Sequence, residues 1–232
     1  MCRYLTNAAA IGATQCFSAF ASTTTVGVWI ETLVRFDFSA GGLQFEQQRS
    51  WFSDLNVSYH VGLFPFSVWL IGLTAVVLAA AIAYAFWTGR DKPRAYYGLM
   101  LLLTGAIVGV FAAQDLLLFY VFFEAMLIPL YVLVGVWGGA GRLGATFKLI
   151  VYTMAGSLLM LVAIIVLGLS QGTFDLVQSG TNGSDWIFRG FVAAFAVKAP
   201  IFPLHAWLPE AYRESSAEVS AVLSGVVSKV AA

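Results

Sequence analysis

FVAAFAVKAPIFPLHAWLPEAYR, residues 191–213, is the stretch that decides the fold. It is apolar enough to cross a lipid bilayer, yet it contains Lys198, His205 and three prolines. A lysine in the hydrocarbon core costs about 2.5–3.5 kcal/mol even on insertion scales, so an intramembrane lysine indicates a functional site. The rest of the chain can be interpreted as the surroundings of Lys198.

The prolines predict a break in the helix that carries this lysine. Pro200 and Pro203 lack the N–H groups that would bond the carbonyls of Ala196 and Ala199, so we expect the helix to open there. Freed carbonyls at membrane depth are tolerated where they are buried in protein or face water. A charge beside a broken helix is typical of ion pathways.

Composition places the chain among integral membrane proteins. Of 232 residues, 60% are hydrophobic and 10% are charged, and the mean hydropathy is +0.85. Water-soluble domains contain about 25% charged residues. The formal net charge is zero and no basic cluster is dense enough to indicate nucleic-acid binding. Cys2 and Cys16, the only cysteines, form neither a disulfide framework nor a metal site.

The hydropathy pattern predicts an all-α, polytopic transmembrane bundle of about seven helices, forming one domain over residues 1–232. The predicted helices are 8–34, 63–87, 95–113, 115–137, 148–169, 187–212 with its proline break, and a last one from residue 218. Residues 35–60 are polar, with a turn signal at Gly41–Gly42, so they should lie outside the hydrocarbon. Gly105 and Gly109 share a helix face and should allow close packing.

Basic residues in the short loops predict the orientation. Seven fall on one side (Arg3, Arg90, Lys92, Arg94, Arg142, Lys148 and Arg213) and three on the other (Arg35, Arg49 and Arg189). This excess predicts a cytoplasmic N-terminus and a cytoplasmic loop 88–94. Residues 35–60 then form a non-cytoplasmic loop.

Three ionisable groups remain well inside the predicted spans: Glu124, Lys198 and Lys229. His205 lies nearer the cytoplasmic end. With a rise of about 1.5 Å per residue, the three lie roughly 14–16 Å from the ends of their spans. They are therefore expected near the midplane of a core about 30 Å thick.

A lysine and a glutamate at this depth could move protons. Burial in general lowers the pKa of a lysine and raises that of a glutamate, whereas proximity of the two reverses both shifts. Moving a proton against roughly 180 mV needs about 4 kcal/mol, or a swing of about three pKa units, which buried lysines can reach. His205, nearly two helical turns after Lys198, could relay the proton. Pro129 should open the helix beside Glu124.

Simpler interpretations stay open. Glu124 and Lys198 could be a static pair that pins two helices, because structural ion pairs also perturb pKa values. His205 could be a packing residue, and Trp207 and Tyr212 fit an interfacial aromatic belt. Five charged residues at the predicted span boundaries are expected to be solvated: Asp115, Glu210, Arg213, Glu214 and Glu218.

Several stretches resemble the antiporter-like membrane subunits of respiratory complex I, of the chain M (mitochondrial chain 4) type. They are NVSYHVG (56–62), LLLFYVFFEAMLIPLYVLVGVWG (116–138), FVAAFAVKAPIFPLHAWLPEAY (191–212) and VSAVLSGVVSK (219–229). The resemblance covers most of residues 45–232. It implies that Glu124 is the family's essential glutamate, Lys198 its pumping lysine, His205 part of its P-x-H-x-W-L-P motif, and Lys229 its connecting lysine.

The sequence also departs from the family pattern. LFPFS follows the YHVG segment where members have an acid and a glycine, and ESSAEVS (214–220) lacks the usual prolines. Members contain many more helices, so we expect this chain to be a fragment without the family's first helix and second half-channel. Its exit residues therefore cannot be assigned.

The resemblance implies a proton-translocating, non-redox subunit of NADH:quinone oxidoreductase. Partner membrane subunits and the lipid bilayer would surround it, and other subunits would carry FMN and iron–sulfur clusters and bind NADH. It also implies a bacterial inner membrane, with the mitochondrial inner membrane as an alternative. A multisubunit Na⁺/H⁺ antiporter subunit, a hydrogenase-linked ion pump and a non-transporting membrane scaffold remain alternative functions.

Overall fold

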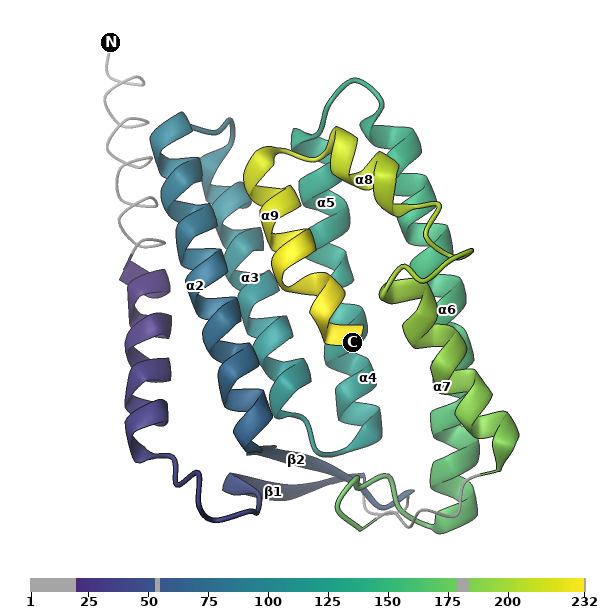
Figure 1. The fold of residues 1–232 in the computed structure, drawn as a ribbon. Helices are drawn as coiled ribbons and strands as arrows, with labels where there is room; N and C mark the ends of the chain where they lie inside the picture. Colours follow the sequence, from purple (N-terminus) through teal and green to yellow (C-terminus); the bar gives the residue numbers. More distant parts are fainter. Residues whose placement is uncertain (1–19, 53–54, 179–183, 232) are drawn as a thin grey trace.

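The structure is a computed structural model that describes residues 20–52, 55–178 and 184–231 (Figure 1). A helix covers residues 20–35, and the other elements follow in order: β1 (Gln44–Phe52), β2 (Val57–Leu63), α2 (Pro65–Thr88), α3 (Pro93–Ala112), α4 (Leu116–Ala125), α5 (Leu127–Trp137), α6 (Arg142–Gln171), α7 (Asp185–Lys198), α8 (Leu208–Glu214), α9 (Ala217–Gly225) and the 3₁₀ helix η2 (Val227–Ala231). Residues 8–19 of the first predicted helix, Cys2, Arg3 and Cys16 lie outside the described residues.

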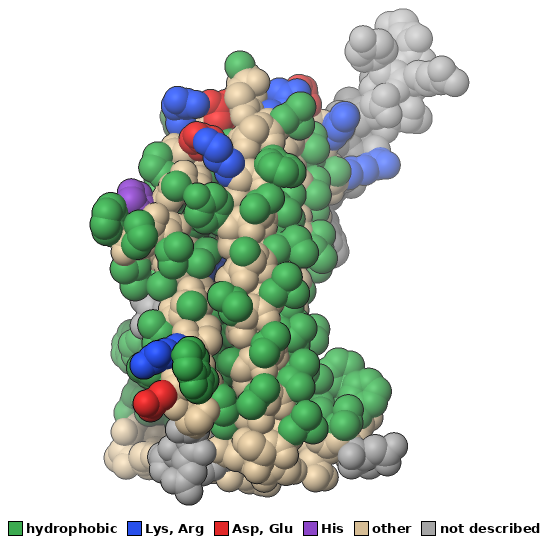
Figure 2. All heavy atoms as spheres, turned by 90° about the vertical axis from the view of Figure 1, so that its right-hand side faces the viewer, with side chains coloured by type: hydrophobic (Ala, Val, Ile, Leu, Met, Phe, Trp, Pro, Cys, Tyr) green, Lys and Arg blue, Asp and Glu red, His purple; other side chains and the backbone are tan. Residues whose placement is uncertain are grey.

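The mostly helical membrane fold is confirmed. Within the described ranges, four stretches are long and apolar enough to cross a membrane: α2, α3, α4 with α5, and α6. They match four of the predicted spans, although α6 begins at Arg142, six residues earlier than expected. The helices run side by side, as in a multi-pass membrane protein. The hairpin of β1 and β2 lies at one end of them (Figure 1). Lys and Arg side chains gather at the other end (Figure 2).

The hairpin was not predicted within the polar segment 35–60. Its strands pair antiparallel with irregularities at two places, and β1 is exposed along almost all of its length. The hairpin is attached to the helix ends because the Gln114 N–H donates to the His60 carbonyl at 2.8 Å. Asp115 is fully buried and caps α4 by accepting from the N–H groups of Leu117 and Leu118. The prediction that Asp115 is solvated is wrong, because the helix end needs its carboxylate.

The helix around Lys198 is broken, as the prolines predicted, and the break is wide. Helix α7 ends at Lys198, and residues 199–207 form turns before α8 begins. The freed carbonyls are bonded inside the protein: the Ile201 N–H donates to Ala196, and the Trp207 indole donates to Val197 at 2.9 Å. Trp207 is only 2% exposed, so its assignment to an interfacial belt is wrong.

Two further helices are interrupted. Helices α4 and α5 meet at Met126, directly after the Glu124–Ala125 pair, which fits the break expected from Pro129. Helix α9 ends at Gly225 and continues as η2, so the last predicted helix is not continuous. Glycine and β-branched valine are poor helix formers, and Gly225 stands directly before Val226 and Val227.

The close-packing prediction for α3 holds for one glycine of the two. A Cβ atom on Gly109 would lie 2.5 Å from the Phe122 ring, whereas a Cβ on Gly105 would meet nothing within 4 Å. Of these two glycines, only Gly109 therefore lies where α4 packs closely on α3.

This difference gives a matched pair of variants. Gly109→Ala should destabilise the protein by about 1–3 kcal/mol, because the methyl group overpacks against Phe122. Gly105→Ala should leave the stability unchanged or raise it by up to about 1 kcal/mol, because alanine favours the helix. Thermal unfolding of the purified protein in detergent measures both. Equal midpoints for the two variants would contradict the packing argument.

Candidate functional site

Lys198 lies at the centre of the candidate site. Its side chain is 2% exposed, and its ammonium donates to the Phe123 carbonyl at 3.1 Å. The same nitrogen lies 3.2 Å from the centre of the Phe123 ring, in a cation–π contact. Lysine in the last turn of α7 also complements the negative end of that helix dipole. Backbone, ring and dipole together hold the ammonium against α4.

Close packing of α7 on its neighbours puts the lysine there. The Phe195 ring lies 6.3 Å from the ring of Phe123 on α4, edge to face. On the other side, Gly156 of α6 lies so close to Val197 that an added Cβ would be 3.0 Å from it. Lys198 therefore cannot reach lipid from this position.

Glu124, the residue after Phe123, faces the same region. Its charge interacts with that of Lys198, but among the described residues no direct salt bridge joins the two. The Oε1 atom of Glu124 is buried and accepts no hydrogen bond from the described part of the chain. The structure thus brings the predicted acid and base close together while leaving them separate.

Two tyrosines lie within electrostatic range of Glu124: Tyr120 and Tyr131. The hydroxyl of Tyr131 lies 3.0 Å from that of Thr153 on α6. Sequence reasoning missed these residues. The spacing of Tyr120 could have revealed it, since a position four before Glu124 lies on the same helix face.

Among the described residues, no hydrogen bond or ion pair joins either of the other two predicted relay residues to this pair. His205 is half-buried in the turns between α7 and α8, and its ring is 5.6 Å from that of Phe202. Its Nδ1 is buried and has no hydrogen-bond partner among the described residues. Lys229 is exposed in η2 and borders a pocket that Phe64 and Gln114 also line, towards the hairpin end.

A second buried charge lies at the end opposite the hairpin. The Glu218 side chain is fully buried; it accepts from the Arg90 guanidinium at 2.6 Å and from the Tyr96 hydroxyl at 2.6 Å. The prediction that Glu218 is solvated is therefore wrong. The same holds for Glu214, whose carboxylate accepts from the Gly141 N–H at 2.7 Å and whose side chain is only 11% exposed. Both carboxylates thus accept from groups in the connections between helices: Glu218 from Arg90, and Glu214 from Gly141.

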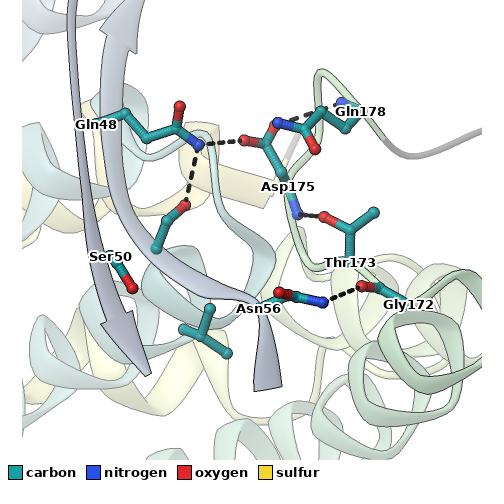
Figure 3. Close-up of a pocket in the computed structure, with 9 residues that line it drawn as sticks. Gln48, Ser50, Asn56, Gly172, Thr173, Asp175 and Gln178 are labelled. Atoms are coloured by element: carbon teal, nitrogen blue, oxygen red, sulfur yellow. Dashed lines mark hydrogen bonds between the residues drawn. The ribbon is translucent and has the colours of Figure 1, made fainter. Parts of the chain in front are cut away.

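A polar cluster joins the hairpin to the loop after α6. His60 is 2% exposed and contacts Asp175 through Nδ1 at 2.7 Å and Glu46 through Nε2 at 3.0 Å. Gln48 also donates to Asp175, at 3.2 Å, beside a pocket of about 570 Å³ (Figure 3). Asn56 donates to the Gly172 carbonyl across the same pocket. These contacts fix the hairpin over α4 and α6.

No group of three or more His, Cys, Asp or Glu side chains in the described ranges is arranged to hold a metal ion. The site around Lys198 contains two titratable charges, two phenols and a backbone carbonyl. Groups of these kinds can bind and release protons.

Comparison with known proteins agrees with this description. The family profile "NADH:quinone oxidoreductase/Mrp antiporter, TM" matches residues 113–232. The NAD(P)H-quinone oxidoreductase chain 4 1 of Nostoc sp. is 41% identical over 202 residues, which are 84% of this chain and 37% of that protein. The chain thus spans a little over a third of the length of this relative.

Solved structures show the same fold. A chain of respiratory complex I from Thermus thermophilus with bound NADH superposes with a TM-score of 0.80 at 33% identity, over 92% of this chain and 46% of that one. A chain of the Mrp complex from Dietzia sp. superposes with a TM-score of 0.83 at 24% identity, over 95% and 42%. The chain belongs to the family of NADH:quinone oxidoreductase and Mrp antiporter membrane subunits, and within it resembles chain 4 of the oxidoreductase.

Proposed function

We propose that the chain is part of a proton-translocating membrane subunit of an NAD(P)H-quinone oxidoreductase. The observation that carries the proposal is the buried Lys198 ammonium, held at a helix break beside Glu124. A buried charge with one carbonyl and one ring as partners can lose its proton more readily than a charge in a tight salt bridge. The similarity to chain 4 of the oxidoreductase supports the assignment.

In this proposal Lys198 takes up and releases the proton, and Glu124 changes the balance between the two states. His205, with a buried nitrogen that has no hydrogen-bond partner among the described residues, is suited to pass the proton on. Lys229 would connect the path to the next part of the protein. Because no hydrogen bond among the described residues joins His205 or Lys229 to the central pair, water would connect them in this proposal.

The protein would lie in a bacterial inner membrane among other membrane subunits, and partner subunits would supply FMN, iron–sulfur clusters and the NADH site. Membership of a Na⁺/H⁺ antiporter is a second candidate, because the matching family profile includes Mrp antiporters. Purification from native membranes separates the two: quinone-reductase subunits should copurify in the first case and antiporter subunits in the second.

The test is proton flux in vesicles that contain the full-length protein within its complex. Glu124→Gln should lower the flux at least tenfold. The variant removes the interaction between the Glu124 charge and Lys198, and a loss of about 1.4 kcal/mol changes the equilibrium between the two proposed states of Lys198 tenfold. Glu31→Gln, which removes an exposed glutamate paired with Arg35, is the control and should not change the flux. Unchanged flux in Glu124→Gln, with the complex assembled, would overturn the assigned role.

A further inference from the structure

One histidine at the hairpin end is enclosed by acids from two different segments. His60 of β2 is only 2% exposed. Its Nδ1 lies 2.7 Å from a carboxylate oxygen of Asp175, in the loop after α6, and its Nε2 lies 3.0 Å from one of Glu46, in β1. Both ring nitrogens thus face carboxyl groups. The number of protons in this cluster therefore decides which of its hydrogen bonds can form.

Counting hydrogens shows that the cluster needs one extra proton. An ionised carboxylate can only accept hydrogen bonds, and a neutral imidazole has a single N–H. A neutral His60 between two carboxylates would leave one ring nitrogen facing an oxygen with no hydrogen between them. Both contacts become hydrogen bonds when the ring carries a second proton, or when one of the two acids is protonated.

The surroundings of the two acids place the proton on the ring. Besides His60, the Asp175 carboxylate accepts from the Gln48 amide at 3.2 Å (Figure 3) and from the Val177 N–H at 2.8 Å. Hydrogen bonds of this kind favour the charged form of a carboxyl group. The Glu46 side chain is 51% exposed, so water stabilises its charge. The extra proton is therefore expected on the imidazole.

Charge balance leads to the same result. The Asp175 side chain is only 3% exposed, and a buried carboxylate is costly without a positive partner. Among the ion pairs of the described residues, His60 is the sole partner of Asp175 and also of Glu46. A neutral ring would leave the buried carboxylate without a compensating charge.

Other charged groups at this junction do not replace the histidine. Arg49 pairs with Tyr59 across the two strands, one position along from the pair that contains His60. Because side chains alternate along a strand, those two extend from the opposite face of the hairpin. Asp115, at the start of α4, accepts from the Ser58 N–H and from two N–H groups of its own helix. It therefore supplies no positive charge either.

We propose that Glu46, His60 and Asp175 form a proton-binding site, in which one proton on His60 joins the hairpin to the loop after α6. Solvent reaches the site through the half-exposed Glu46 and through the pocket of about 570 Å³ that Asp175 lines. Loss of the proton would remove one of the two hydrogen bonds of His60 and weaken the link. The inference goes beyond the proposed function, because it uses none of the residues of the proposed proton path.

Nitrogen NMR of the full chain in lipid, labelled with ¹⁵N-histidine, measures the charge of this ring. The chain contains two histidines, so the signals that remain in His205→Gln belong to His60. At pH 7.5 a histidine in water has about one charged ring for ten neutral ones. We expect the ratio of charged to neutral His60 to be at least tenfold higher. A ratio equal to that in water would overturn the proposal.

Glu46→Gln tests the counting of hydrogens directly. The glutamine amide can donate to Nε2, so a neutral ring then forms hydrogen bonds on both sides. The ratio of charged to neutral His60 at pH 7.5 should therefore fall at least about tenfold. Asp37→Asn is the matched control, because it removes an acid of the same polar segment that is hydrogen-bonded to Ser39 instead. An unchanged ratio in Glu46→Gln, or an equal fall in Asp37→Asn, would contradict the assignment.

Hydrogen exchange of the β2 backbone amides at a fixed pH tests the link between the hairpin and the loop. His60→Gln keeps no charged donor between Glu46 and Asp175. Exchange in Val57–Leu63 should become at least about tenfold faster, the effect of losing one hydrogen bond to a charged group. Exchange as slow as in the wild type would show that the protonated ring does not hold the hairpin. Neither measurement requires proton flux, so both are independent of the vesicle experiment.

Discussion

Replacing Lys198 with methionine is expected to reduce proton flux to the leak rate, a loss of at least about 100-fold. Methionine has a similar length and suits the surrounding Phe123 and Phe195 rings, so it keeps the packing and removes only the ammonium. The unfolding midpoint should stay the same or rise, because the protein no longer buries this charge. Flux in vesicles and thermal unfolding in detergent measure the two effects separately.

Two further variants sharpen this prediction. Lys92→Met removes an exposed loop lysine and should leave the flux unchanged. The double variant Lys198→Met with Glu124→Gln should lose no more flux than Lys198→Met alone, because residues that act as one unit are not additive. If Lys198→Met retained a tenth of the wild-type flux or more, this lysine would not carry the proton. A static pair that only pins helices would show lower stability and normal flux instead.

The central pair could be predicted because its signals are local. A lysine and a glutamate within apolar spans are costly, so they have to face the protein interior, and prolines mark where a helix opens. Those rules placed the break after Lys198 and the interruption beside Glu124, and the structure shows both. Hydropathy also located the four long spans, because the bilayer thickness imposes their length.

The errors concern residues whose surroundings come from distant parts of the chain. Asp115 and Glu218 stand at span boundaries, where hydropathy alone indicates solvent, but a helix end and an arginine from another loop bury them. Trp207 fits an interfacial belt by type, whereas the freed Val197 carbonyl requires a donor. Strand β1 was missed because nearly all of it is exposed. An exposed strand has no buried face, so its sequence lacks the alternation of apolar and polar residues that marks a half-buried strand.

The buried Glu218 carries the largest expected effect on stability. Glu218→Ala leaves the Arg90 guanidinium and the Tyr96 hydroxyl without their acceptor, and Arg90 is only 22% exposed at its side chain. Removing one partner of a buried ion pair costs about 3–5 kcal/mol. For a chain of this size the unfolding midpoint should fall by about 10 °C. Glu210→Ala is the control, because its partner Lys148 is half-exposed and surface pairs contribute about 1 kcal/mol or less.

The double variant Arg90→Leu with Glu218→Leu distinguishes two causes of the lost stability. One is the Arg90 charge left without its partner, and the other is the missing contact between α9 and the loop after α2. Replacing both charges with apolar side chains leaves no unpaired charge, so most of the lost stability should return. Helix α9 would then keep its place beside α2 through its buried apolar residues Val219, Val222 and Leu223. If the double variant were as unstable as Glu218→Ala, the ion pair itself would have to hold α9 and the loop after α2 together.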